Sequence, residues 1–137
     1  MHRKNLEAAV ETAARECELS FFTGHEHRIN ESLTRTPALW LAPLEAVGSQ
    51  GIREGIRTYA VRMTIIEKPD RESAANPEQV WRRMEDKASN VCHILGEAEC
   101  VKSLSDIKFT AATASVTNRR EISMAITMKV QVPFTTI

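Results

Sequence analysis

The strictest pattern in this sequence is a run near its end in which apolar and polar side chains alternate. Every second position from 122 to 134 is apolar: Ile122, Met124, Ile126, Met128, Val130, Val132 and Phe134. Successive side chains of a strand point to opposite faces of a sheet, so this period of two predicts a strand with one buried face and one more polar face.

Two earlier segments predict a long hairpin. Residues 56–67 alternate in the same way, and residues 38–44 read as their partner strand. Pro43 interrupts the partner strand, which suggests an edge position or a bulge. The glycine-rich residues 48–55 then form the tip of the hairpin.

Two segments have the spacing of amphipathic helices. Residues 4–22 place apolar side chains on one stripe, and Gly24 stands where the helix would end. A second helix is expected over 77–95, with Asn76 as its N-cap, a proline at its first position and Gly96 as its stop.

A second hairpin completes the chain, with strands at 106–116 and 121–134 and a turn at 117–120. The order is therefore α-β-β-α-β-β, which predicts a single α+β domain over residues 1–137. The simplest assembly is a four-stranded antiparallel sheet made of two hairpins, with two amphipathic helices packed on one face. Its other face is left toward solvent or a partner.

The charge balance argues against nucleic acid as a partner. The 137 residues contain 18 Lys and Arg and 18 Asp and Glu, whereas a nucleic-acid binder usually shows a basic excess. A net charge of zero gives little repulsion between copies. No apolar run is long enough for a signal peptide or a membrane span, so a cytoplasmic protein that does not contact membrane is expected. The three cysteines show no disulfide pattern.

The candidate catalytic and metal-binding groups are weak. Cys17 and Cys92 fall late in their helices, at the wrong end of the helix dipole for a reactive thiol. His25 and His27 have no third ligand nearby in sequence, and His93 adjoins Cys92 at an angle unsuited to chelation. We therefore expect no enzyme, metal or cofactor. The alternative is a small ligand-binding or enzyme domain with a pocket between helices and sheet, for which these groups would have to converge.

The order of elements resembles that of the tail terminator, or tail completion, proteins of long-tailed bacteriophages. The likeness starts from Thr36-Pro37-Ala38-Leu39-Trp40-Leu41, a first strand that opens with a proline after a loop, followed by the strand at 59–66. It implies a structural protein, acting in a bacterial cytoplasm or in a virion, that forms a hexameric ring. The ring would end tail-tube growth and join the tail to the head connector. The family offers no motif from which functional residues could be transferred.

The tip of the first hairpin is the candidate contact site. A ring needs two different patches on each subunit, and a projecting hairpin plus a sheet edge would supply them. The candidate residues are Gly48, Gln50, Gly51, Arg53, Glu54 and Gly55. A regulatory module that dimerises through its sheet face is a further interpretation.

Overall fold

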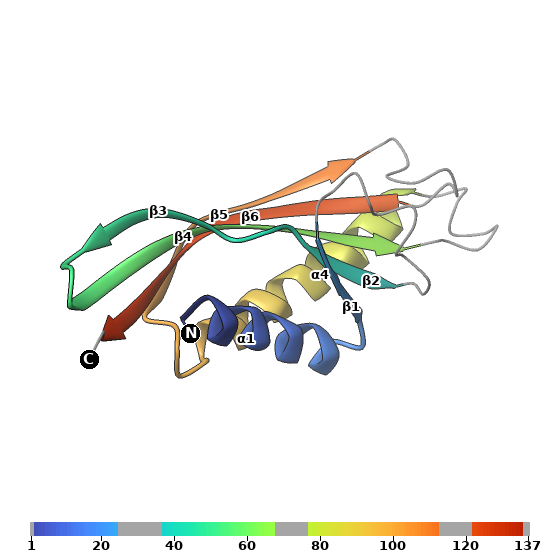
Figure 1. Cartoon of the computed structure of the whole chain (residues 1–137). Coiled ribbons are helices and arrows are strands. Elements are labelled where there is room, and N and C mark those ends of the chain that lie inside the picture. The colour runs from blue at the N-terminus through green and yellow to red at the C-terminus, as the bar shows by residue number, and fades with distance from the viewer. Residues whose placement is uncertain (1, 25–36, 68–76, 113–121, 136–137) are drawn as a thin grey trace.

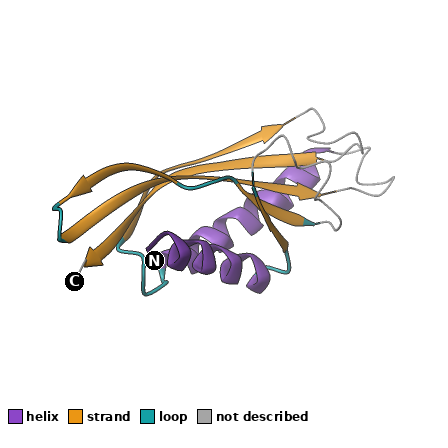
Figure 2. Ribbon diagram, viewed as in Figure 1, coloured by secondary structure: helices purple, strands orange, loops and turns teal. Residues whose placement is uncertain are grey.

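A computed structural model describes residues 2–24, 37–67, 77–112 and 122–135. Within these ranges, two helices lie on one face of a mixed sheet of six strands (Figures 1 and 2). The predicted α+β class is confirmed. The predicted sheet of four antiparallel strands is wrong in detail, because two additional short strands are present and one pair is parallel.

The elements follow one another along the chain as α1 (His2–Glu16), β1 (Ser20–Thr23), β2 (Ala38–Leu41), β3 (Glu45–Gln50), β4 (Glu54–Glu67), α4 (Pro77–Gly96), β5 (Ser103–Ala112) and β6 (Ile122–Thr135). The strand order across the sheet is β1-β2-β4-β6-β5. Strand β3 also pairs with β4. It lies on the same side of β4 as β2, beside residues 56–60, whereas β2 lies beside residues 63–66.

The centre of the sheet is a ladder of β4 and β6. These two strands pair over their whole length, from Glu54 opposite Thr135 to Glu67 opposite Ile122. The apolar positions of β6 from Met124 to Phe134 are buried, as the alternation predicts. The final predicted strand is therefore confirmed, with its bounds shifted by one residue.

The predicted strand at 38–44 is shorter in the structure, because β2 ends at Leu41. A separate strand, β3, begins at Glu45 and also pairs with β4. The break falls at Pro43, where proline has no N–H to donate to a ladder. Just before it, the Ala42 N–H still donates to the Arg62 carbonyl at 3.0 Å. The irregularity expected from this proline thus lies between β2 and β3.

The first helix is shorter than the predicted 4–22, because its end is set by backbone geometry rather than by Gly24. Glu18 has a φ of 61°, the left-handed conformation that commonly ends helices. The N–H of Leu19 donates to the Ala14 carbonyl at 2.9 Å, and that of Glu18 to the Arg15 carbonyl at 3.0 Å. Since the chain then turns back, residues 20–23 become β1, parallel to β2.

Replacing Glu18 with glycine should stabilise the protein by about 1 kcal/mol, because glycine adopts positive φ without the steric cost that a side chain carries. Thermal unfolding would show this as a higher melting temperature. Glu7→Gly, the same change inside α1, should cost about 1 kcal/mol. A Glu18→Gly variant as unstable as Glu7→Gly would contradict this explanation of the helix end.

The helices bury the apolar stripes that the sequence shows. The predicted second helix is confirmed as α4, and its positions Val80, Met84, Ala88, Val91 and Leu95 are fully buried. The predicted N-cap Asn76 lies outside the described residues. Together with α1 and the helix-facing side of the sheet, these side chains form the main core.

A second, smaller cluster lies on the opposite face of the sheet, which we expected to be polar. It consists of Ala38, Trp40 and Ile66, with Phe22 packed against them. The Trp40 indole Nε1–H donates to the Gly24 carbonyl at 2.9 Å, and its ring stacks with Phe22 at a centroid distance of 6.4 Å. At the end of the sheet that contains β1 and β2, both faces are therefore apolar.

The predicted strand at 106–116 is β5, which begins earlier, at Ser103. Its ladder with β6 is interrupted between Ser105 and Lys108. Asp106, inside this bulge, has a φ of 53°. The predicted turn at 117–120 lies outside the described residues.

Candidate contact surface

The sheet extends past the N-terminal end of α1 as a projection (Figures 1 and 2). It consists of β3, residues 54–60 of β4 and residues 129–135 of β6, which we call the arm. Every residue of β3 is exposed. The arm therefore offers a strand to solvent that contributes little to the core.

The tip of the arm is a tight turn that depends on two of the predicted residues. Gln50 and Ile56 form the last pair of the β3–β4 ladder, so residues 51–55 connect these two positions, with Glu54 and Gly55 already in β4. Gly51 and Gly55 have φ values of 96° and 153°, and a Cβ at either one would collide with a backbone carbonyl across the turn. The Ser49 hydroxyl donates to the Gly51 carbonyl at 3.1 Å. The tip therefore has a fixed shape.

Alanine at Gly51 or Gly55 should cost about 1–3 kcal/mol each, because it combines a disfavoured φ with a backbone collision. Gly48→Ala is the matched control, since its Cβ would meet Thr58 at an ordinary 3.9 Å. Equilibrium denaturation of the three variants gives the comparison. Equal stability of all three would mean that the turn has a different shape.

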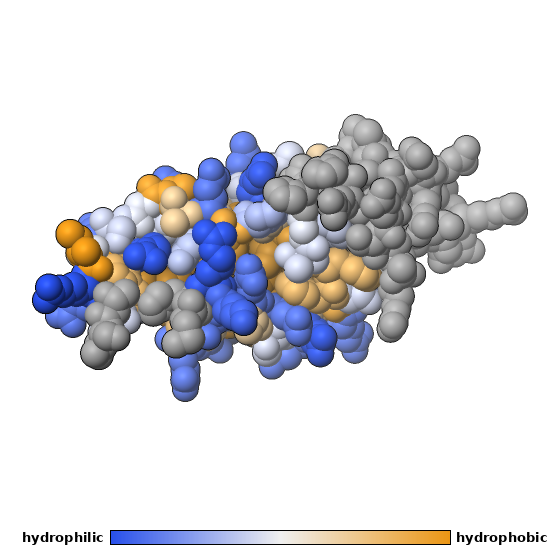
Figure 3. Space-filling view, viewed as in Figure 1, coloured by the Kyte–Doolittle hydropathy of each residue, from blue (hydrophilic) through white to orange (hydrophobic). Residues whose placement is uncertain are grey.

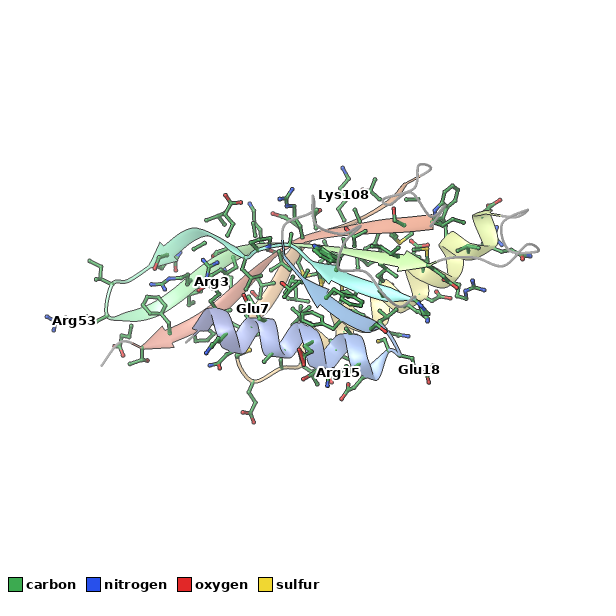
Figure 4. All side chains as sticks on the ribbon, turned by 45° about the vertical axis from the view of Figure 1, so that its right-hand side comes forward. Arg3, Glu7, Arg15, Glu18, Arg53 and Lys108 are labelled. Atoms are coloured by element: carbon green, nitrogen blue, oxygen red, sulfur yellow. The ribbon has the colours of Figure 1, made fainter. Side chains whose placement is uncertain are left out.

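The other predicted residues lie where the sequence placed them, along the hairpin. Gly48 is in β3, just after a register shift, and Gln50 ends that strand. Arg53 lies at the far end of the arm (Figure 4), next to Glu54, which begins β4. The structure thus brings all six candidates into one hairpin, with the turn narrower than the predicted 48–55.

Sequence reasoning missed the apolar residues of this hairpin. Ile52 is 90% exposed at the tip, and Val47 is 51% exposed in β3. Apolar atoms accordingly lie beside strongly hydrophilic ones at the end of the arm (Figure 3). An isoleucine between turn glycines was a usable signal, because turn residues are normally polar.

Two arginines that the sequence did not single out hold the arm in place. An Nη1–H of Arg3 in α1 donates to the Leu44 carbonyl at 2.6 Å, and the guanidinium lies 5.8 Å from the centre of the Tyr59 ring. Further out, the Arg57 guanidinium lies 4.4 Å from the centre of the Phe134 ring. Since cation–π contacts are attractive at these distances, the arm is fastened both to α1 and between its own strands.

Among the described residues, the candidate chemical groups do not form a site together. Cys92 is buried in the core, and this burial raises its pKa to about 11. The neighbouring His93 is exposed, with its Nε2 3.3 Å from the Glu97 carboxylate. Burial is also the main cause that raises the pKa of Cys17 and Cys100. All three thiols are therefore protonated at neutral pH, the unreactive form.

His25 and His27 lie outside the described residues. In the ranges that are described, no group of three His, Cys, Asp or Glu side chains is placed to hold a metal ion. Neither described helix is long and apolar enough to cross a membrane.

No protein-family model and no curated protein matches this sequence. What the molecule itself defines is an α+β protein with two helices on one face of a mixed sheet and a projecting three-stranded arm. Its function has to be argued from that arm.

Proposed function

We propose that this chain is a non-enzymatic assembly protein that forms a ring, in the manner of a phage or prophage tail terminator. The ring would cap the tail tube and join it to the head connector. It would form in the bacterial cytoplasm and remain in the virion. The observation that carries the proposal is the arm, whose fixed tip presents the exposed Ile52.

The exposed edge strand of the arm supports a role in contact with another protein chain. Natural proteins usually keep edge strands short or blunt them, because unpaired backbone groups invite another chain. Here β3 is exposed along its whole length and contains no lysine or proline, so its edge is blunted only by Glu45 and by the bulge between Ala46 and Gly48. An arm with these properties is more useful in an assembly than in an isolated subunit.

The sheet offers the two different patches that a ring requires. A head-to-tail interface joins two different patches, and it closes into a ring when the rotation between copies allows. The arm lies on the β3 side of the sheet, and β5 forms the opposite edge. A net charge of zero does not oppose association of several copies. The hexameric state is taken from the family resemblance alone.

Light scattering of the purified chain, alone and with its cognate tail-tube protein, tests this function. We expect a ring-sized species in at least one of these conditions. Shortening residues 48–55 should abolish binding to the tube, while Asp86→Ala on the exposed side of α4 should not. A chain that stays monomeric in both settings, and behaves the same when shortened, would favour a small binding domain instead.

A further inference from the structure

Strands β3 and β5 form opposite edges of the sheet and overlap along it over three rows, those of Lys129, Val130 and Gln131 in β6. Where the arm joins the body, the sheet is four strands wide. One row across it runs through Ala46, Tyr59, Val130 and Leu104, and another through Gly48, Thr58, Gln131 and Ser103. A neighbour placed side by side would therefore bring its β5 to this β3.

The strand directions favour such a contact. Each of the pairs β3–β4, β4–β6 and β6–β5 is antiparallel, so β3 and β5 run in opposite directions. Copies related by rotation about an axis along the strands keep these directions. The β3 of one copy would then run antiparallel to the β5 of the next, the more stable relation between adjacent strands.

Each edge also carries an exposed aliphatic side chain at a bulge. Val47 lies at the register shift of β3 between Ala46 and Gly48, and Ile107 lies at the shift of β5 between Ser105 and Lys108. Val47 is 51% and Ile107 44% exposed, and with Ile52 they are the exposed large hydrophobic residues of the described ranges. Since bulges disturb a ladder, side chains must provide much of any contact here.

A shift of one copy relative to the next along the strand direction brings these two residues level with each other. Val47 lies level with the stretch 130–131 of β6 and Ile107 with 127–129, a difference of roughly 8 Å at the usual rise per residue. Strands that close around an axis tilt and stagger in this way. The same stagger brings Glu45 beside Lys108 of the next copy, which has the opposite charge. Lys108 lies on the face away from the helices (Figure 4).

We infer that the contact between copies joins the β3 edge of one subunit to the β5 edge of the next, with Val47 packed against Ile107. This inference rests on the proposed ring and names the surfaces that build it. It also separates two roles on the arm. The edge meets a second copy of this chain, and the tip at Ile52 remains for the tube.

Sedimentation velocity over a concentration series, alone and with the tube protein, provides the test. Val47→Lys and Ile107→Glu should each raise at least tenfold the concentration at which half of the chain is in the ring. Each puts a lone charge into an apolar contact. The double variant Val47→Lys/Ile107→Glu should recover much of the loss, because the new charges then face each other between copies.

Ser89→Lys is the control, since it adds the same charge at an exposed position of α4, away from both the edge contact and the tip of the arm, and it should leave ring formation unchanged. Both edge residues are exposed, so thermal melts of the single variants should match the unmodified chain. A ring that forms equally well in both single variants would overturn the contact while leaving the proposed function in place. A double variant no better than the singles would also overturn it. A chain that never associates would overturn both.

Discussion

Ile126→Asp should destabilise the protein by more than about 4 kcal/mol, because it places a carboxylate without a partner in the main core. The side chain of Ile126 is 0% exposed and lies between Met63 and Phe109 on the neighbouring strands. Whole domains of this size are stable by about 5–15 kcal/mol, so the variant should lose a large fraction of its free energy of unfolding. Urea denaturation followed by circular dichroism measures the change.

Thr127→Asp is the control for this experiment. It makes an acidic residue at the next position of β6, on the face away from the helices and beside Arg62. Its cost should stay below about 1 kcal/mol, since opposite charges in adjacent strands are mildly favourable. If the two variants were equally stable, the assignment of the buried face of β6 would be wrong.

Trp40→Ala should cost about 3–5 kcal/mol, as expected when a buried aromatic side chain is truncated. Trp40 is 1% exposed, in the cluster on the face away from the helices, and the variant also loses the hydrogen bond to Gly24. Thermal unfolding of the purified variant is a sufficient measurement.

The same truncation at Trp81 in α4 gives a matched comparison. Trp81 is only partly buried, and among the described residues its Nε1–H has no acceptor. Because a buried donor without a partner is itself unfavourable, Trp81→Ala should cost at least about 1 kcal/mol less than Trp40→Ala. The reverse order would mean that the second cluster adds little to stability.

Periodicity predicted the elements that have one buried face and enough length to show it. The alternation at 122–134 and the helical spacing at 77–95 located β6 and α4 to within a residue or two. Both patterns arise because the side chains on one face of the element are buried against a neighbouring layer. Such side chains recur every two residues in a strand and about every 3.6 residues in a helix.

The elements that escaped prediction are short or depend on contacts remote in sequence. Strand β1 continues the apolar stripe of α1, since Phe21 reaches the same core from a strand instead of a helix. The left-handed Glu18 that separates the two elements carries no sequence signal, because glycine is the usual residue there. The buried face of Trp40 likewise depends on partners brought together by the fold.

The candidate contact site was found from its glycines and charges, but its apolar residues were not. Gly51 and Gly55 are required by turn geometry, which sequence shows well. Whether Val47 and Ile52 are buried or exposed depends on where the helical layer ends, and that follows only from the packing. Arg3 could not be assigned to the arm because Leu44, its acceptor, is 41 residues away in sequence.

The unbroken β4–β6 ladder couples the arm to the body. Fourteen residues of β4 pair with β6 in one register from the tip to the far end of the helices, with no bulge at which one half could separate from the other. Amide hydrogens that bond within the β4–β6 ladder of the arm should therefore exchange with solvent about as slowly as those over the core, through the same cooperative opening. Amides of β6 beyond Gln131 that point away from β4 lie outside the ladder with β5 and should exchange faster. Strand β3, bound on one side only, should exchange faster.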